Sequence, residues 1–339
     1  MTLTVTTPGV TLRRSGICIT ADYRDGIRRV PASDVSTILL TEPCAVTSEL
    51  LTLCMERGIT VTMLDRAGTP MWSVDRFQGG AAPMIHRAQL SLAESADGVK
   101  LAKSLLRRKN ENRCQLLKRL AGNRRNQSGA ALKEAVGRIA ELTAKLDQVR
   151  GTAVSAVRQE LMGLEGSSGR IYFHALSGIL PKGTGFQKRM RGPEADPFSQ
   201  LLNYGYGILY HRLTSLCAQA NLNPYIGLLH AEAYNRPVLV YDLIEPFRAD
   251  VEEVVFKLFS RNRKGFDRYL TPCEGGRCLS AEGKKALIAA IEERMEGPDG
   301  NRGRGADMRE LVFELSRRLK ASVEDGDGKG ADDVLLCDV

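Results

Sequence analysis

The spacing of the apolar residues changes once along this 339-residue chain, and that change divides the chain in two. Up to about residue 77, apolar and polar residues mostly alternate, as in LTVT at residues 3–6 and ITVTML at residues 59–64. Beyond GGAAP at residues 79–83, apolar residues recur every third or fourth position. Alternation is typical of strands with one buried face, and the longer spacing is typical of amphipathic helices. We therefore predict an α+β multidomain fold, with an N-terminal β-strand-rich domain followed by a larger all-α domain.

Domain boundaries follow from this change and from the charge of the C-terminus. We place the strand-rich domain at residues 1–80, the helical domain at residues 84–320 and an acidic tail at residues 321–339. The tail carries six acidic side chains and one lysine, a net charge of −5, which leaves +13 on the rest of a chain whose formal charge is +8. So polar a segment has too little apolar surface to pack, and we expect it to be disordered.

Start and stop residues locate several helices. Ser48 can cap a short helix that ends before Gly58, and Asp196 can cap a helix running to about Ala220. Pro237 can open a helix that is kinked or ended near Pro246 and continues to Phe259. Further helices are expected over about 130–180, 283–296 and 306–320.

Cysteine placement favours free thiols in a reducing cytoplasm. Eight cysteines are scattered along the chain, several of them inside apolar runs. Cys273 and Cys278 bracket EGGR without a second Cys or His pair nearby, so we favour a loop over a zinc knuckle. No run of about 18 apolar residues occurs, and nothing indicates export or a membrane.

The positive charge is compatible with binding to nucleic acid, but an ordinary basic enzyme would explain it equally well. Basic residues are concentrated in the helical stretch that follows residue 100, where they could follow DNA phosphates or form a solvated face. They are Arg107, Arg108, Lys109, Arg113, Lys118, Arg119, Arg124 and Arg125.

Three acidic residues stand in apolar surroundings. Asp242 and Glu245 lie three positions apart on one helix face, and buried carboxylates need a partner such as a divalent metal or Arg248. Glu165 lies among glycines, which permit either the close approach of a ligand or helix packing, and packing is the simpler explanation. Of the four histidines, His230 stands apart because it follows a turn and a short apolar segment.

Three motifs together resemble the signature of the CRISPR-associated endonuclease/integrase family, Cas-one. They are LMGLEGSSGRIYF at residues 161–173, NPYIGLLH at residues 223–230 and YDLIEPFR at residues 241–248. Their order and intervals also match, and DPFSQLLNYGY at residues 196–206 and the strand-rich half are similar to that family. The resemblance covers about residues 3–260. One departure is Ser199-Gln200, where the family often has Asn-Ala, which affects an expected contact beside the site.

The resemblance implies that Glu165, His230 and Glu245 are catalytic metal ligands, with Asp242 beside them as an outer carboxylate. Two carboxylates and a neutral imidazole suit Mg²⁺ or Mn²⁺ and leave positions open for phosphate oxygens and water. Such a metal can polarise a phosphodiester and orient the attacking oxygen. Water as the attacker gives cleavage, and a DNA 3′ hydroxyl gives strand transfer, which the resemblance implies for the insertion of new spacers into the CRISPR array.

Other residues receive weaker roles. Arg170 and Tyr172 follow Glu165 on its helix and are candidate helpers, although Tyr172 could equally belong to the core. Candidate DNA-binding residues come from the glycine-rich loop at residues 181–193 and from the segment after Glu245; they are Lys182, Lys188, Arg189, Arg191 and Arg248.

The resemblance also implies partners: DNA in the form of a protospacer and a CRISPR repeat, a second copy of the chain paired through the strand-rich domains, and a small companion protein, Cas-two, in a heterohexamer-like complex. A different class of function stays open beside it. The chain could be a DNA-binding scaffold whose metal site is structural or silent. The intact Glu165, His230 and Glu245 favour the enzyme.

Overall fold

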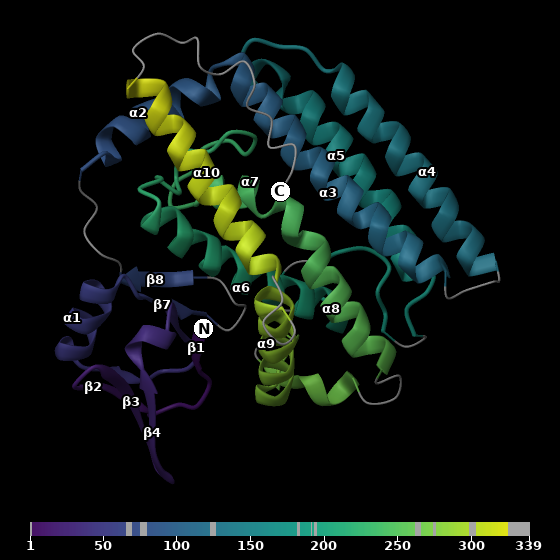
Figure 1. The fold of residues 1–339 in the computed structure, drawn as a ribbon. Helices are drawn as coiled ribbons and strands as arrows, with labels where there is room; N and C mark the ends of the chain where they lie inside the picture. The colour runs from purple at the N-terminus through teal and green to yellow at the C-terminus, as the bar shows by residue number, and fades with distance from the viewer. Residues whose placement is uncertain are drawn as a thin grey trace.

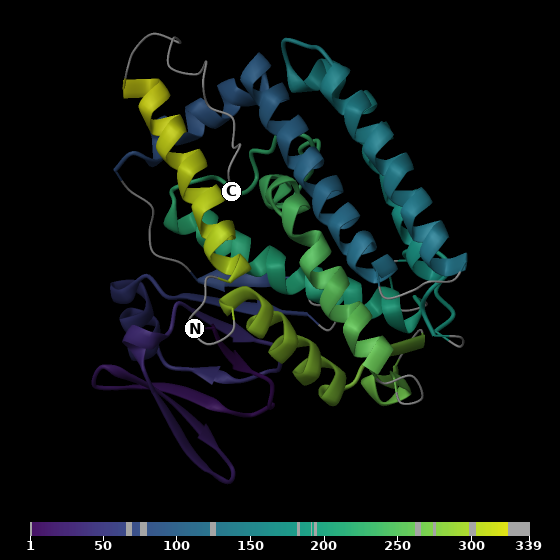
Figure 2. The same cartoon turned by 45° about the vertical axis from the view of Figure 1, so that its right-hand side comes forward.

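The computed structural model describes residues 2–65, 70–74, 80–122, 127–181, 184–190, 192, 195–261, 266–273, 276–297 and 303–324. These residues form a strand-rich lobe and a larger helical lobe, which lie side by side in Figures 1 and 2. The change of fold class along the chain is confirmed, because the strands of the first lobe all precede residue 75 and helices dominate after it. Among the described residues, no helix is both long enough and apolar enough to cross a membrane.

Two four-stranded sheets build the first lobe. The strands are β1 (Thr2–Val5), β2 (Thr11–Ser15), β3 (Cys18–Tyr23), β4 (Gly26–Pro31), β5 (Thr37–Leu40), β6 (Ala45–Val46), β7 (Thr60–Leu64) and β8 (Pro70–Val74). One sheet has the order β1-β5-β7-β8, in which only β8 is antiparallel to its neighbour. The other has the order β4-β3-β2-β6, in which β6 is parallel to β2 and the other pairs are antiparallel.

The core of this lobe lies beside β5. All four residues of β5 are buried because the strand is flanked by β1 and β7 and covered on its faces. Ile38 and Val61 contribute to one apolar cluster together with Leu50 and Leu53 of helix α1 (Ser48–Arg57). A short 3-10 helix, η1 (Ala32–Asp34), adds Ala32 to the same cluster.

Helix α1 spans the residues predicted for it. Its cap is Thr47, one residue earlier than expected, whose side chain accepts a hydrogen bond from the Leu50 amide at 3.4 Å. Gly58 ends the helix in the left-handed region, with φ of 67°, where glycine avoids the strain of a side chain.

The second lobe is mostly helical. Its elements are α2 (Ala82–Ala93), α3 (Ala96–Gly122), α4 (Gln127–Gln148), α5 (Val154–Ser177), α6 (Pro197–Gln219), α7 (Val238–Leu243), η2 (Glu245–Phe247), α8 (Arg248–Arg261), η3 (Phe266–Tyr269), β9 (Leu270–Cys273), β10 (Gly276–Leu279), α9 (Ala281–Glu296) and α10 (Arg304–Glu324). Helices α3, α4 and α5 run side by side (Figures 1 and 2), and α6 is buried along most of its length. Asp196 caps α6 as predicted, accepting from the Ser199 amide at 2.9 Å.

The single helix predicted over about 130–180 is wrong, because the chain breaks into α4 and α5 at residues 149–153. Gly151 permits this turn: a Cβ there would lie 2.6 Å from Val157 Cγ1. The C-terminal end of α4 is also capped from outside, since Lys103 Nζ donates to the Asp147 and Val149 carbonyls at 3.0 and 2.9 Å. Apolar spacing continues across the break, and therefore did not reveal it.

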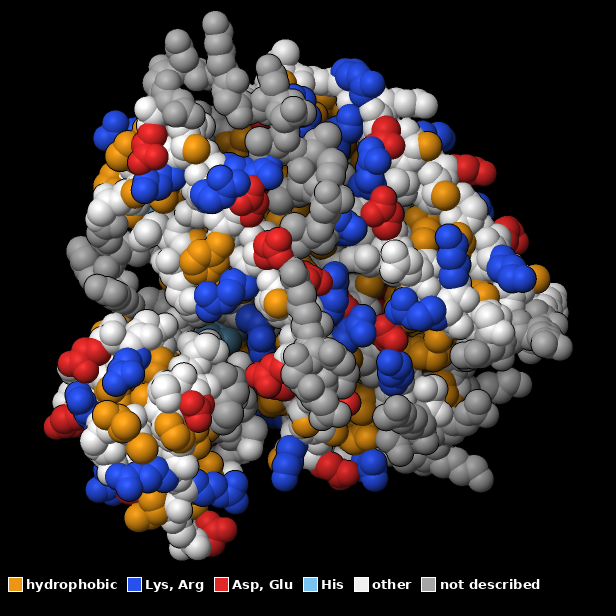
Figure 3. Space-filling view, viewed as in Figure 1, with side chains coloured by type: hydrophobic (Ala, Val, Ile, Leu, Met, Phe, Trp, Pro, Cys, Tyr) orange, Lys and Arg blue, Asp and Glu red, His pale blue; other side chains and the backbone are white. Residues whose placement is uncertain are grey.

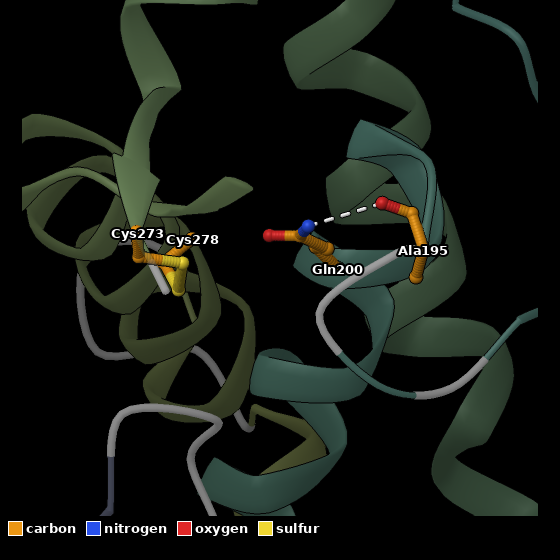
Figure 4. Close-up of a disulfide and its surroundings, with 4 residues drawn as sticks. All are labelled: Ala195, Gln200, Cys273 and Cys278. Carbon is orange, nitrogen blue, oxygen red and sulfur yellow. Dashed lines mark hydrogen bonds between the residues drawn. A yellow bond between two sulfur atoms is a disulfide. The ribbon is translucent and has the colours of Figure 1, made fainter. Parts of the chain in front are cut away.

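A short hairpin, β9 paired with β10, interrupts the helical lobe where a loop was expected. Cys273 and Cys278 form a disulfide across it, as Figure 4 shows, so the expectation of free thiols does not hold for this pair. It does hold for the buried Cys54 and Cys217. Gln200, near the hairpin at the start of α6, donates to the Ala195 carbonyl at 3.0 Å (Figure 4) and thus supports the loop before α6.

Polar contacts from α6 and α9 join the two lobes. Ser215 Oγ lies 2.6 Å from Thr60 Oγ1, Arg212 donates to Thr2 Oγ1 at 3.2 Å, and Lys284 Nζ lies 2.9 Å from Glu42 Oε1.

At the other end of the chain, α10 extends to Glu324, beyond the predicted end at residue 320. The rest of the predicted acidic tail, residues 325–339, lies outside the described residues.

Candidate metal centre

Glu165 and Glu245 reach the same place from different elements. Glu165 lies in the middle of α5, and Glu245 is the first residue of η2. Pro246 follows Glu245 and cannot donate a backbone hydrogen bond, which explains why the helix that begins as α7 changes its course here. The Glu245 side chain is 4% exposed and that of Glu165 is 24% exposed, so Glu165 marks the side of the site that faces solvent.

The ammonium of Lys109, from α3, lies between these carboxylates. Its Nζ forms one ion pair with Glu165 Oε1 and a second with Glu245 Oε2 at 2.5 Å. The Lys109 side chain is only 3% exposed. A buried ammonium is unfavourable unless it is paired, and here two carboxylates pair with it. The sequence analysis grouped Lys109 with basic residues that could follow phosphates, whereas the structure makes it part of the site.

Both carboxylates are held in the ionised form. Burial alone would raise the pKa of Glu165, but the charge and the hydrogen bond of Lys109, together with the charge of Arg113, bring that pKa below its ordinary value. Burial would also raise the pKa of Glu245, and there the positive charges of Arg248 and Lys109 together lower it. Ionised carboxylates are the form that binds a metal ion.

Arg248, at the start of α8, holds Glu245 from behind. Its Nε donates to Glu245 Oε1 at 3.0 Å, and one terminal nitrogen donates to the Tyr210 hydroxyl at 3.2 Å. The guanidinium also lies 4.8 Å from the centre of the Tyr206 ring. With a residue exposure of 6%, Arg248 has little surface to offer a DNA phosphate, in contrast to the role expected from the sequence.

Asp242 fixes both the backbone and the ring of His230. Its Oδ1 accepts from the His230 amide at 3.0 Å and lies 2.6 Å from His230 Nδ1. Its Oδ2 accepts from the amides of Leu228 and Leu229 at 2.6 and 3.1 Å. Asp242 is fully buried. Engaging Nδ1 in this way leaves Nε2 as the nitrogen available to a metal, as is usual for metal-binding histidines.

Two residues that the sequence analysis missed hold the segment that carries His230. Gln89 of α2 donates to the Asn223 carbonyl at 3.0 Å and accepts from the Asn223 amide at 2.8 Å. Arg158 of α5 donates to the Leu229 carbonyl at 3.1 Å. Both contacts join residues that lie far apart in the sequence, so no local pattern could have identified them.

The predicted ligands lie near one another but are not arranged as a complete metal-binding group. His230 lies close enough to Glu245 to help lower the pKa of that carboxyl. Within the described part of the chain, however, no three His, Cys, Asp or Glu side chains are grouped so that they could hold a metal ion. The donor chemistry still fits a divalent cation: two carboxylates converge on a positive charge, and Glu245 Oε2 is buried without a well-aligned hydrogen-bond donor.

Next to the carboxylates lies a second buried ion pair that the sequence analysis also missed. Arg113 of α3 donates to Glu252 of α8 through two nitrogens, at 2.6 and 3.2 Å, and the Tyr206 hydroxyl donates to the same carboxylate at 2.8 Å. The Arg113 guanidinium lies 4.6 Å from the centre of the Tyr172 ring. Tyr172 is fully buried, so it packs in the core behind Glu165.

The other predicted residues lie at or outside the edge of this arrangement. Arg170 is exposed and donates to Ser167 Oγ at 2.9 Å. Lys188 is exposed, whereas Arg189 stacks 4.5 Å from the centre of the Tyr206 ring and donates to Asn203. Lys182 and Arg191 lie outside the described residues. On the face that Figure 3 shows, basic side chains occur on both lobes and are interspersed with acidic ones.

Comparison with known proteins gives a consistent result. The family model described as CRISPR associated protein Cas1 matches residues 3–293. A CRISPR-associated endonuclease Cas1 of Thermus thermophilus is 31% identical over 334 residues, which cover 95% of this chain and 96% of the relative. Another, of Archaeoglobus fulgidus, is 26% identical over 321 residues, which cover 91% of each chain.

Solved structures share the fold. A Cas1 protein from Thermotoga maritima superposes with a TM-score of 0.74 at 20% identity, covering 96% of this chain and 97% of that chain. A casposase bound to integration product has a TM-score of 0.77 at 18% identity, covering 95% and 91%. A chain of a Cas6-RT-Cas1–Cas2 complex has a TM-score of 0.77 at 20% identity, covering 97% of this chain and 35% of that one.

These likenesses define the class of protein: a CRISPR-associated protein with a strand-rich lobe followed by a helical lobe. Within that class, the chain belongs to the Cas1 family, and nuclease and integrase activity in CRISPR adaptation follows from that membership. The resemblance drawn from the three sequence motifs is thereby confirmed.

Proposed function

We propose that this chain is a divalent-metal-dependent DNA endonuclease/integrase that inserts new spacers into a CRISPR array by phosphodiester cleavage and transesterification. One observation carries the proposal: in a chain of the Cas1 family, Glu165 and Glu245 converge from α5 and η2 on one buried cation next to His230. Such convergence of acidic side chains is unfavourable unless a cation occupies the space between them.

Glu165, His230 and Glu245 are the proposed ligands of Mg²⁺ or Mn²⁺. A metal held there supplies positive charge to the scissile phosphodiester and to the attacking oxygen. The 24% exposure of the Glu165 side chain gives a substrate phosphate access from that side, whereas the buried Glu245 anchors the site from within.

The surrounding residues orient these ligands. The Asp242 carboxylate lies 2.6 Å from His230 Nδ1, orients the ring through that contact, and leaves Nε2 as the ring nitrogen that can face a metal. Arg248 fixes one oxygen of Glu245 and leaves the other directed toward Lys109. Because both supporting residues are buried, they act on the ligands without touching DNA.

In cleavage the attacking oxygen belongs to water, and in strand transfer it belongs to a DNA 3′ hydroxyl. In either case a new phosphorus–oxygen bond forms and the attacking water or hydroxyl loses a proton, while the bond to the leaving oxygen of DNA breaks and that oxygen takes up a proton to become a hydroxyl. Strand transfer therefore exchanges one phosphodiester for another and needs no external energy source.

The proposed partners are protospacer and repeat DNA, a second copy of the chain paired through the strand-rich lobe, and Cas2 in a heterohexamer-like complex in the cytoplasm. Solved complexes of the same fold support this: one contains Cas1 with Cas2, and a casposase was solved with its integration product. Lys188, which is exposed, is the described loop residue best placed to meet a DNA phosphate.

Strand cleavage and strand transfer on branched and repeat-containing DNA test the proposal, with Mn²⁺, Mg²⁺ or EDTA and with Cas2 present. We expect activity that depends on metal and that falls at least 100-fold in His230→Ala and Glu165→Ala, since a metal ligand contributes several kcal/mol to the transition state. His174→Ala is the matched control, because His174 is exposed on the same helix as Glu165.

Duplex binding without metal-dependent chemistry in the wild-type chain would overturn the enzyme proposal in favour of a DNA-binding scaffold. Activity that survives in His230→Ala would instead overturn the assignment of His230 as a ligand.

A further inference from the structure

Lys109 is unusual among the basic residues of α3 because its charge faces the interior of the site. Its ammonium contacts one oxygen of each proposed carboxylate ligand, and the two carboxylates come from elements 80 residues apart in the chain, at Glu165 and Glu245. Lys109 and Arg248 together carry two positive charges against the two negative charges of these carboxylates. The charges of these four groups therefore sum to zero.

A divalent cation cannot be added to this arrangement as it stands. Carboxylate oxygens bind Mg²⁺ at about 2.0–2.1 Å, and the same oxygens already contact the Lys109 ammonium. Two positively charged groups held by the same oxygens would lie within roughly 4 Å of each other in a poorly solvated site, where their repulsion is strong. One of them has to leave.

We propose that Lys109 is a placeholder for the metal: its ammonium holds Glu165 and Glu245 together in the metal-free protein and leaves the space between them when a divalent metal binds. The inference rests on the proposed function, since it takes these two carboxylates as metal ligands. Lys109 is then a positioning residue. It keeps the site assembled while no metal is bound, and it competes with the metal for the same oxygens.

The absence of a ready-made metal cluster among the described residues is consistent with this role. His230 stands near Glu245, but an ammonium sits at the point where the two carboxylates meet. Displacing it would let Glu165, the more exposed of the two, close on the metal from the solvent side.

Lys103 provides a matched control. It lies six residues earlier on α3 and is half-buried, and its ammonium donates to the backbone carbonyls of Asp147 and Val149 at the end of α4. Replacing Lys103 removes an ammonium and its contacts from the same helix and leaves the carboxylates untouched.

The first measurement is the dissociation constant for Mn²⁺ of the full chain, obtained by electron paramagnetic resonance of free Mn²⁺ without DNA. We expect Lys109→Met to bind Mn²⁺ at least tenfold more tightly than the wild type, because no ammonium has to be displaced. Lys103→Met should bind like the wild type. Thermal unfolding should show a lower midpoint for metal-free Lys109→Met, and a larger upward shift on adding Mn²⁺ than the wild type shows.

A Mn²⁺ affinity in Lys109→Met that equals or falls below that of the wild type would overturn the placeholder role. The result would mean that Lys109 orients the carboxylates together with the metal. If Lys109→Met does not fold, a crystal structure of the wild-type chain with Mn²⁺ decides. We expect Nζ of Lys109 to be more than 4 Å from at least one carboxylate, and retention of both contacts beside bound Mn²⁺ contradicts the inference.

Failure of the inference can be told apart from failure of the proposed function. If the wild type binds Mn²⁺ and Glu165→Ala does not, the metal site stands and only the role of Lys109 is in question. If neither the wild type nor Lys109→Met binds Mn²⁺, both are overturned.

Discussion

At the scale of single residues, burial determines which basic side chains can contact DNA and which instead pair with acidic residues inside the protein. Lys109 and Arg113 belong to one basic stretch of α3, yet both are nearly fully buried and paired with glutamates. Arg107 and Arg119 of the same stretch are half exposed and pair with Asp147 and Glu253. Removing one partner of a buried ion pair is strongly destabilising, because the other charge is left buried and unpaired. Substitutions of Lys109 or Arg113 should therefore lower the stability of the protein for a reason unrelated to DNA binding.

One buried histidine gives the protein a dependence on pH that is separate from the site. His211 of α6 is almost completely buried, and burial together with the nearby Arg212 lowers the pKa of its imidazole from 6.5 to about 3. The unfolded chain therefore binds a proton below pH 6.5 that the folded chain does not. Stability is unaffected above that pH and falls as the pH decreases toward 3, by at most about 1.4 kcal/mol per pH unit.

We expect His211→Leu to reduce the loss of stability between pH 6 and pH 4, because the leucine cannot take up a proton in the unfolded state. Urea unfolding at several pH values measures this. His174→Leu, which changes an exposed histidine, should leave the slope unchanged. An identical pH slope in wild type and His211→Leu would show that His211 is not the group responsible.

At the scale of elements, the site depends on where helices are interrupted. His230 lies in the irregular segment before α7, and Glu245 lies where Pro246 turns α7 into η2 and α8. A continuous helix would carry the carboxylates of Asp242 and Glu245 along one axis. The break at Pro246 instead places Glu245 opposite α5 and α3. The interruption between α4 and α5 likewise lets α5 run back along α3 and present Glu165 to Lys109.

Glycines within helices have opposite roles in α5 and α6. Gly163 is exposed in α5, and a Cβ there meets no atom within 4 Å. Gly205 is buried in α6, and a Cβ there would lie 2.5 Å from Val251 Cγ1 of α8. Neither close approach nor packing therefore requires the glycine at 163, although the sequence analysis favoured packing for the glycines around Glu165.

We predict that Gly163→Ala raises the free energy of unfolding by about 0.5–1 kcal/mol, because alanine is the better helix former. Gly205→Ala should lower it by about 1–3 kcal/mol, because the added methyl overpacks the contact between α6 and α8. Chemical denaturation of the two variants beside the wild type measures both effects. A stabilising Gly205→Ala would contradict the tight packing of these helices.

At the scale of the whole molecule, charge and catalysis are separated in space. The chain has a formal net charge of +8, and on the face that Figure 3 shows basic side chains occur on both lobes, while the proposed ligands lie within the helical lobe. Phosphate contacts contribute affinity in proportion to the number of cations released from DNA, and their effect declines with salt. Affinity for duplex DNA should therefore come from many weak contacts and not from the metal site.

We expect His230→Ala to bind duplex DNA within about threefold of the wild type and with the same dependence on salt, since it changes no cationic contact to phosphate. Lys188→Glu should weaken binding and lower the slope of log Kd against log salt by about one or two. Fluorescence anisotropy between 50 and 300 mM salt, in EDTA, measures this. A comparable loss of binding in His230→Ala would mean that the site itself contributes to duplex affinity.

The sequence by itself determined the fold class and the position of several helix ends, because spacing, caps and prolines act over a few residues. It also determined family membership, through three motifs whose order and intervals are specific. It did not reveal the break at Gly151, because apolar spacing continues across that break. It also did not reveal the disulfide hairpin, which depends on pairing between β9 and β10.

Only the tertiary structure decided that Lys109 belongs to the site and that Arg113 pairs with Glu252. Arg248 was one of two partners that the sequence left open for the nearby carboxylates, and the structure pairs it with Glu245. The glutamates that pair with Lys109 and Arg113 come from elements far from α3 in the sequence. A basic residue on an amphipathic helix has the same local pattern whether it meets water, phosphate or a carboxylate. Burial and pairing are properties of the packed molecule, because they depend on which faces of distant helices come together.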